Sequence, residues 1–171
     1  MEIPKDVWQA MQHGDWYLGN TSELQLLRQH TSQLCWFINQ PNHNEQARKE
    51  ALQQLLPNVV NVEIGAHFAC DFGINIFCNG PLLVKHNVVI LDHNKVNLGS
   101  HVVIEEGVVI ATVTHPLEEQ KRKAGWQQAH AIHIGNHVTL GAHCSVLPGA
   151  SIPDNTTVPA GTVVTKSMYA L

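Results

Sequence analysis

The feature that most constrains the fold is a six-residue repeat that runs from Ile132 to Thr165. An aliphatic residue recurs at every sixth position, and a small or β-branched residue precedes each one by two positions. The aliphatic positions are Ile134, Leu140, Val146, Ile152, Val158 and Val164, and the preceding positions are Ile132, Val138, Cys144, Ala150, Thr156 and Thr162. A six-residue period does not fit a helix, whereas a short strand with alternating side chains followed by a turn fits it well. The repeat therefore predicts a mainly β protein, a β-helix built from hexapeptides.

The same repeat extends upstream in two further sets. In chain order these are Ile64, Cys70 and Ile76, and then Leu98, Ile104 and Ile110. The first set is offset from all the others by two residues, which predicts a slip of the register between Gly80 and Ile90. We expect the residues of every set to form the core of a stiff prism.

Residues 1–57 differ in character from this pattern and predict an N-terminal helical segment, which leaves 58–171 for the β-helix. Ser22 followed by Gln25 is typical of a capping box at the start of a helix. A second helix is expected to begin near Asn42 and to stop at Pro57, because proline cannot continue a helix.

The β pattern is interrupted once, by a long polar segment over 114–131 that contains the charge run Glu118 to Lys123. A long excursion from a regular scaffold often carries function, because the scaffold fixes both of its ends. A solvated loop is the other interpretation. His115 and Pro116 stand at the root of this loop, where a histidine is held by the last strand.

The composition excludes several classes of function. A chain of 171 residues accommodates one core, and its net charge of −4 with 14% charged residues gives no basic footprint for nucleic acid. No apolar run resembles a signal peptide or reaches membrane-spanning length, so we expect a cytoplasmic protein with no membrane partner.

Cysteine and histidine are the candidate metal ligands of this sequence. The four cysteines form no CxxC pair, which indicates buried reduced thiols. His101, His137 and His143 are separated by multiples of six and so could share one edge of the prism. No carboxylate or cysteine joins them at ligand spacing, so a solvated histidine row is favoured and no metal is expected.

Five segments resemble the maltose and galactoside O-acetyltransferases, which are hexapeptide-repeat acyltransferases. They are MQHGDWY (11–17), CDFGINI (70–76), ATVTHP (111–116), IHIGNHVTLGAHCSVLPGASI (132–152) and GTVVTK (161–166). The resemblance implies a left-handed parallel β-helix and a homotrimer with active sites between subunits, across which the long loop extends. It also implies acetyl-CoA as the acetyl donor and a hydroxyl of a sugar or related small molecule as the acceptor.

Site residues are carried over from the resemblance by motif. His115 resembles the catalytic base, a role that suits an imidazole because it titrates near neutral pH. The residues that match the coenzyme A site are Gly141, Ala142, Ala160, Gly161, Thr165 and Lys166.

The chain departs from the family on the acceptor side. Lys85 replaces a usual asparagine, His93 a common aspartate and Thr139 a usual tryptophan, whereas Asp71 matches a variant of the family pattern. Asp71, Lys85, His93 and Tyr17 are therefore the expected acceptor-binding residues. The Gly-x-Pro-Ala stretch that follows Lys166 in most relatives is missing, which the resemblance links to weaker coenzyme A binding.

Three functions remain open from the sequence. The leading hypothesis is an acetyl-CoA-dependent O-acetyltransferase with His115 as general base. The alternative is an inactive trimer that serves as a binding or assembly module, because the acceptor residues are altered. A histidine-metal hydratase is a third, although the spacing of its ligands is poor.

Overall fold

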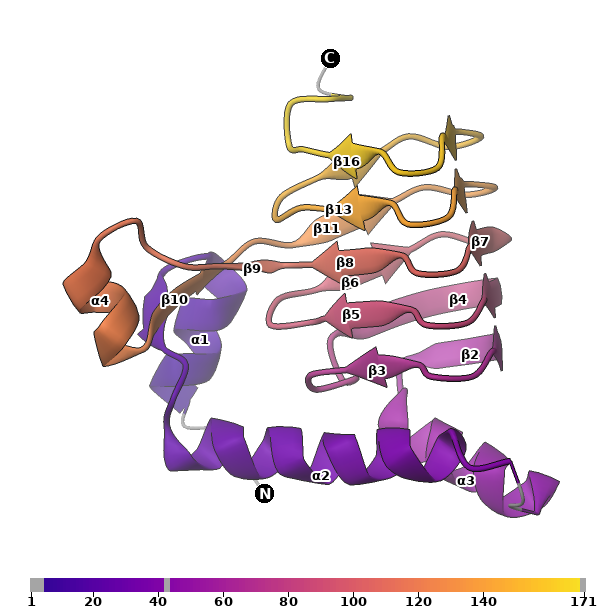
Figure 1. The fold of residues 1–171 in the computed structure, drawn as a ribbon, viewed down its shortest axis with the longest axis horizontal. Coiled ribbons are helices and arrows are strands. Elements are labelled where there is room, and N and C mark those ends of the chain that lie inside the picture. Colours follow the sequence, from indigo (N-terminus) through magenta and orange to yellow (C-terminus); the bar gives the residue numbers. More distant parts are fainter. Residues whose placement is uncertain (1–4, 42–43, 170–171) are drawn as a thin grey trace.

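Each repeat forms a short strand whose first and third side chains point inward and whose middle side chain points outward. In the computed structural model, which describes residues 5–41 and 44–169, Ile132 and Ile134 are buried while His133 between them is exposed. Both members of each apolar pair therefore face the interior, as expected for a core. The strands stack into a parallel β-helix (Figure 1), the left-handed hexapeptide fold that the repeat and the resemblance predict.

The strands lie on three faces of a prism. β4 (Ile76–Val84) belongs to two of them, because Ile76 to Cys78 pair with β6 and Leu82 to Val84 pair with β7. The first face also contains β6 (Val96–Leu98), β11 (Ile132–Ile134) and β14 (Ser151–Ile152). The second contains β2 (Val59–Ile64), β7 (Val102–Ile104), β12 (Thr139–Leu140) and β15 (Thr157–Val158). The third contains β3 (Ala69–Cys70), β5 (Val89–Leu91), β8 (Val109–Ala111), β13 (Ser145–Val146) and β16 (Val163–Val164).

The predicted position of the register slip is wrong. The six-residue spacing is kept through Gly80, because Val84 and Ile90 are both buried at their expected places. The spacing instead widens to eight residues twice, from Cys70 to Cys78 and from Ile90 to Leu98. Both insertions fall where the chain passes from the third face to the first.

The N-terminal segment is helical with one strand, as most of the pattern predicts. It contains α1 (Lys5–His13), β1 (Trp16–Leu18), α2 (Ser22–Ile38) and α3 (Glu45–Leu55). The expected cap at Ser22 is one residue late, because Thr21 is the N-cap and its hydroxyl accepts from the Leu24 amide at 3.5 Å. The predicted start near Asn42 lies outside the described residues, and α3 begins after Asn44, whose side chain accepts from the Gln46 amide.

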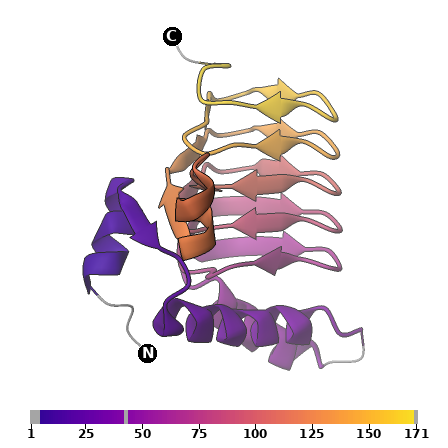
Figure 2. The same cartoon turned by 60° about the vertical axis from the view of Figure 1, so that its left-hand side comes forward.

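The long loop forms an arm with its own secondary structure. It contains β9 (Val113–Thr114), α4 (Glu119–Ala124) and β10 (Trp126–Ala129), and β10 pairs antiparallel with both β9 and β1. In Figures 1 and 2 this arm and α1 lie beside the stack of strands, and α2 and α3 lie across its N-terminal end. None of the described helices is long and apolar enough to span a bilayer.

Asp92 joins the two enlarged turns. Its side chain is fully buried, and its oxygens accept from the Phe72 amide at 2.8 Å and from the Asn75 amide at 3.2 Å. Burial raises the pKa of this carboxyl to about 7, although the two N–H donors oppose the rise. The turns are therefore held together by a carboxyl group whose charge folding disfavours.

This carboxyl predicts a pH dependence of stability. Because the folded-state pKa of Asp92 lies above that of the unfolded chain, its contribution to stability is complete below about pH 4 and is lost as the pH rises through about 7. Between these limits we expect the free energy of unfolding of the wild type to fall by up to about 4 kcal/mol relative to Asp92→Asn, which cannot ionise. The asparagine side chain of Asp92→Asn loses one of the two backbone hydrogen bonds, which shifts the free energy of unfolding of this variant by an amount that does not vary with pH.

Urea unfolding of both proteins at a series of pH values measures this difference. If the two free energies ran parallel from pH 4 to pH 7, Asp92 would not titrate there.

Candidate functional site

The site lies where the chain passes from the third face to the first, a region that we call the loop corner. It is formed by the segments 71–75, 91–95 and 112–131, which come from successive turns of the coil. The Thr112 hydroxyl links the last two of these segments, because it accepts from the Asn94 amide at 2.9 Å and donates to the Leu91 carbonyl at 2.8 Å, and Asp92 links 91–95 to 71–75. The extra residues of the two enlarged turns thus lie directly beside the root of the arm.

Three of the predicted site residues meet in this corner. The Tyr17 hydroxyl lies 2.6 Å from His93 Nδ1, and His93 Nε2 lies 2.8 Å from Asp71 Oδ2. Tyr17 and His93 are each 3% exposed, whereas 26% of the Asp71 side chain remains exposed. In this chain an acceptor can therefore reach Asp71, whereas Tyr17 and His93, which are also expected to bind the acceptor, lie behind it.

The surroundings of His93 fix its ring. The edge of Phe72 packs against it with ring centroids 4.9 Å apart, and the Arg28 guanidinium lies over the Phe72 ring at 5.8 Å. Burial raises the pKa of Tyr17 well above its ordinary value, an effect that Arg28 partly offsets. The phenol therefore keeps its proton at any physiological pH.

His115 follows β9 at the root of the arm and is exposed. Thr114 pairs with Gln128 of β10, and Gln128 pairs with Trp16 of β1 on its other side. Neighbouring strands lie about 4.8 Å apart, so the backbones near His115 and Tyr17 are separated by about 10 Å across this small sheet. One sheet thus positions the expected base and the phenol that contacts His93.

Four of the expected cofactor residues lie at a second corner, between the second and third faces, which we call the glycine corner. The Gly141 amide donates to Val158 at 2.9 Å, and the Gly161 amide donates to Ala142 at 2.8 Å, so these residues and Ala160 are stacked. A Cβ on Gly141 would lie 2.6 Å from the Ala160 nitrogen, which makes this glycine a structural requirement. Gly161 has a φ of 72° and open space beside it.

Lys85 also lies at the glycine corner, where its amide donates to Ile104 at 2.8 Å. Within one chain it lies apart from Asp71, so the expectation that both bind the acceptor stays a prediction. Thr165 and Lys166 follow β16 and lie above the loop corner. A Cβ on Gly149 would meet Lys166 Cδ at 3.4 Å and His130 Cβ at 3.7 Å. The residues that match the family's cofactor site are thus divided between two corners of a single chain.

The predicted histidine row is only partly formed. The rings of His101 and His137 stack with centroids 4.7 Å apart, whereas His143 lies at the glycine corner beside Gly107. Over 5–41 and 44–169, no three His, Cys, Asp or Glu side chains are grouped so that they could hold a metal ion. All four cysteines are buried free thiols.

Sequence reasoning missed the buried polar residues that build the loop corner, which are Asn75, Asp92, Asn94 and Thr112. The Asn94 amide group donates to the Met11 carbonyl at 2.6 Å and to the Ala129 carbonyl at 3.1 Å, and so ties α1 and the arm to the coil. The sequence signal for these residues is the polar run over 92–94, which falls where two successive apolar positions are eight residues apart instead of six.

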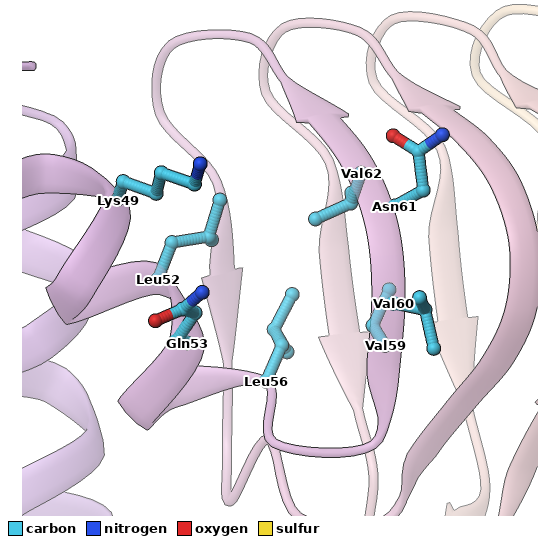
Figure 3. A pocket seen from close by; sticks show the side chains of 8 residues that line it. All are labelled: Lys49, Leu52, Gln53, Leu56, Val59, Val60, Asn61 and Val62. Atoms are coloured by element: carbon cyan, nitrogen blue, oxygen red, sulfur yellow. The ribbon is translucent and has the colours of Figure 1, made fainter. Parts of the chain in front are cut away.

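A hollow of about 220 Å³ lies elsewhere, between α3 and β2 (Figure 3). Its lining is largely aliphatic, and Lys49 is the one charged residue among the eight that line it. It brings together no pair of groups for acid–base chemistry, so the loop corner remains the candidate site.

Comparison with known proteins identifies the family. The sequence profile of the maltose acetyltransferase hexapeptide capping motif matches residues 10–59. The galactoside O-acetyltransferase of Escherichia coli K12 is 30% identical over 139 residues, which is 79% of this chain and 68% of the relative. An acetyltransferase homologue of Saccharomyces cerevisiae is 34% identical over 126 residues, which is 73% of this chain and 64% of that protein.

Solved structures agree with these relatives. A maltose O-acetyltransferase from Clostridium difficile 630 superimposes with a TM-score of 0.87 at 28% identity, over 94% of this chain and 87% of the other. A hexapeptide-repeat acetyltransferase from Vibrio cholerae, solved in complex with acetyl-CoA, gives a TM-score of 0.80 at 26% identity, over 92% and 86%. With the repeat, the coil and the N-terminal segment all shared, the chain belongs to the maltose and galactoside O-acetyltransferase family of hexapeptide-repeat acetyltransferases.

Proposed function

We propose that this protein transfers the acetyl group of acetyl-CoA to a hydroxyl of a sugar or a related small acceptor. The observation that carries the proposal is the small sheet β1-β10-β9, which holds His115 about 10 Å from the β1 backbone that carries Tyr17, whose hydroxyl contacts His93 and through it Asp71. The acetyl-CoA complex of the Vibrio cholerae relative supports the donor, and the galactoside and maltose relatives support the acceptor class.

The proposed reaction needs one base and one fixed acceptor. Asp71 accepts a hydrogen bond from the acceptor and orients it, while the His115 imidazole removes the proton of the reacting hydroxyl. The oxygen attacks the thioester carbonyl, and the carbon–sulfur bond breaks as His115 returns the proton to the departing thiolate. The cysteines take no part.

The glycine corner supplies backbone donors for the acetyl oxygen. Gly141 and Ala142 are the two expected residues at the acetyl end of the cofactor. The Gly141 amide already donates to Val158 within the coil, so we assign the Ala142 amide as the donor to the oxyanion. The base His115 and the donor Ala142 lie at different corners of one chain, so they can act on the same acetyl group only if the site is formed by two chains. We therefore propose a homotrimer in which His115 of one subunit faces the glycine corner of the next.

Replacement of the base is the first test. We expect His115→Ala to lower kcat/KM by about 10²–10⁴, the usual contribution of a general base, while acetyl-CoA still binds. Acetyl-CoA-dependent thiol release with methyl β-galactoside or maltose measures the rate, and calorimetry measures binding. His30→Ala, at an exposed position of α2, is the matched control.

An unchanged rate in His115→Ala would contradict the assignment of the base. A wild-type protein that binds no acetyl-CoA would instead favour the inactive binding module.

Mixing of inactive variants tests the shared site. His115→Ala and Ala160→Trp are each expected to be inactive, because one lacks the base and the other blocks the glycine corner. Refolded together as random trimers, they should recover about a quarter of the wild-type activity. In that share of the interfaces, one subunit supplies an intact His115 and the other supplies an intact glycine corner. If mixed trimers formed, as shown by two affinity tags, and yet stayed inactive, the site would not be shared between subunits.

A further inference from the structure

A buried imidazole stands between a phenol and a carboxylate at the loop corner. His93 touches Tyr17 through Nδ1 and Asp71 through Nε2, at 2.6 Å and 2.8 Å. An aspartate is common at this position in the family, whereas in this chain the side chain is a histidine that is only 4% exposed.

The hydrogen bonds define where the protons lie. The Asp71 carboxylate can only accept, so Nε2 of His93 carries a proton, and we assign the Tyr17 hydroxyl, which burial keeps protonated, as the donor to Nδ1 of the neutral ring. A neutral imidazole that accepts at Nδ1 carries its proton at Nε2, which then donates to Asp71 Oδ2. The chain of bonds therefore runs from the phenol through the imidazole to the carboxylate.

The fold anchors both ends of this series of hydrogen bonds. Tyr17 lies in β1, where it pairs with Gln127 of the arm, and Asp71 directly follows β3 of the coil. Phe72 packs its edge against the imidazole, and its own amide is fixed by Asp92 at 2.8 Å. His93 thus has little freedom to turn, and it holds one oxygen of Asp71 while the carboxylate remains partly exposed.

We propose that, of these three residues, only Asp71 contacts the acceptor, through Oδ1, and that His93 and Tyr17 are positioning residues that hold its carboxylate in one orientation. This inference rests on the proposed acetyl transfer and assigns specificity within that site. The histidine that replaces the family's aspartate thus supports an acceptor-binding carboxylate in place of supplying one. Strand β1, which carries Tyr17, thus controls the affinity for the acceptor without contacting the acceptor.

A double-mutant cycle tests this inference with methyl β-galactoside as acceptor. Tyr17→Phe removes the donor to Nδ1 and should raise the acceptor KM about fivefold, with kcat and the acetyl-CoA KM unchanged. Asp71→Asn should raise the acceptor KM about tenfold or more. Adding Tyr17→Phe to Asp71→Asn should cost nothing further, because the phenol acts through the carboxylate.

Two replacements of His93 separate positioning from packing. Gln offers an oxygen to Tyr17 and an N–H to Asp71, so His93→Gln should keep an acceptor KM within about twofold of the wild type, whereas His93→Leu should match Asp71→Asn. Tyr169→Phe, the same change at the other tyrosine of the chain, is the control and should leave all constants unchanged.

Nuclear magnetic resonance tests the proton arrangement without any acceptor. Nitrogen-15 shifts of His93, assigned by comparison with His93→Gln, should show one Nε2–H tautomer in the wild type and a mixture of tautomers in Tyr17→Phe.

The kinetic and the magnetic resonance measurements together distinguish failure of the proposed function from failure of this inference. A protein that acetylates neither methyl β-galactoside nor maltose but shows the Nε2–H tautomer contradicts the proposed function and retains the Tyr17–His93–Asp71 hydrogen bonds. An Nδ1–H tautomer in the wild type, or an equal effect of Tyr17→Phe with and without Asp71, overturns the inference.

Discussion

The stacking of inward-facing side chains inside the prism is the constraint on which the rest of the structure depends. Ile132 and Ile134 of β11 lie in register with Val96 and Leu98 of β6, and Ile134 also meets Ile152 of β14. Each such side chain contributes about 1.5–3 kcal/mol when it is buried, and a shift by one residue would turn all of them to solvent. The register is therefore fixed on every turn, and side chains at the corners are held at fixed heights along the coil.

The candidate site lies where this regularity is interrupted. The two eight-residue spacings add backbone at the loop corner, and the polar groups that they bury are hydrogen-bonded, as burial of polar groups requires. Asp92 bonds the enlarged turns to each other, and Asn94 bonds α1 and the arm to the coil. Asp92 also fixes the amide of Phe72, which packs against the His93 ring that holds the Asp71 carboxylate, so the bonds that stabilise this corner also shape the candidate site.

Much of the fold could be predicted from the sequence, because the six-residue period is a direct consequence of the backbone geometry. The slip was misplaced because Ile74 and Ile76 mimic a hexapeptide pair, although Ile74 packs with the α1 side chains and the true pair is Ile76 and Cys78. The spacing between Ile90 and Leu98 carried the correct signal. Helix caps were misjudged by one or two residues, because several neighbouring residues are equally good N-caps.

The candidate site was predicted less completely than the fold. The motifs indicated His115, Asp71 and the glycine corner, but a motif does not reveal which side chains are exposed. Burial of Tyr17 and His93 arises from the strand β1 and from Phe72, which come from distant parts of the chain. The resemblance groups Lys85 with Asp71, and the path of the coil separates them by a whole face within one chain, so their joint role depends on a second subunit.

The most direct test of this account is a crystal structure of the protein soaked with acetyl-CoA. We expect a trimer with the coenzyme between the glycine corner of one subunit and the loop corner of the next, and with the acetyl group beside His115. Acetyl-CoA bound away from both corners, or a monomer with His115 remote from it, would contradict the account.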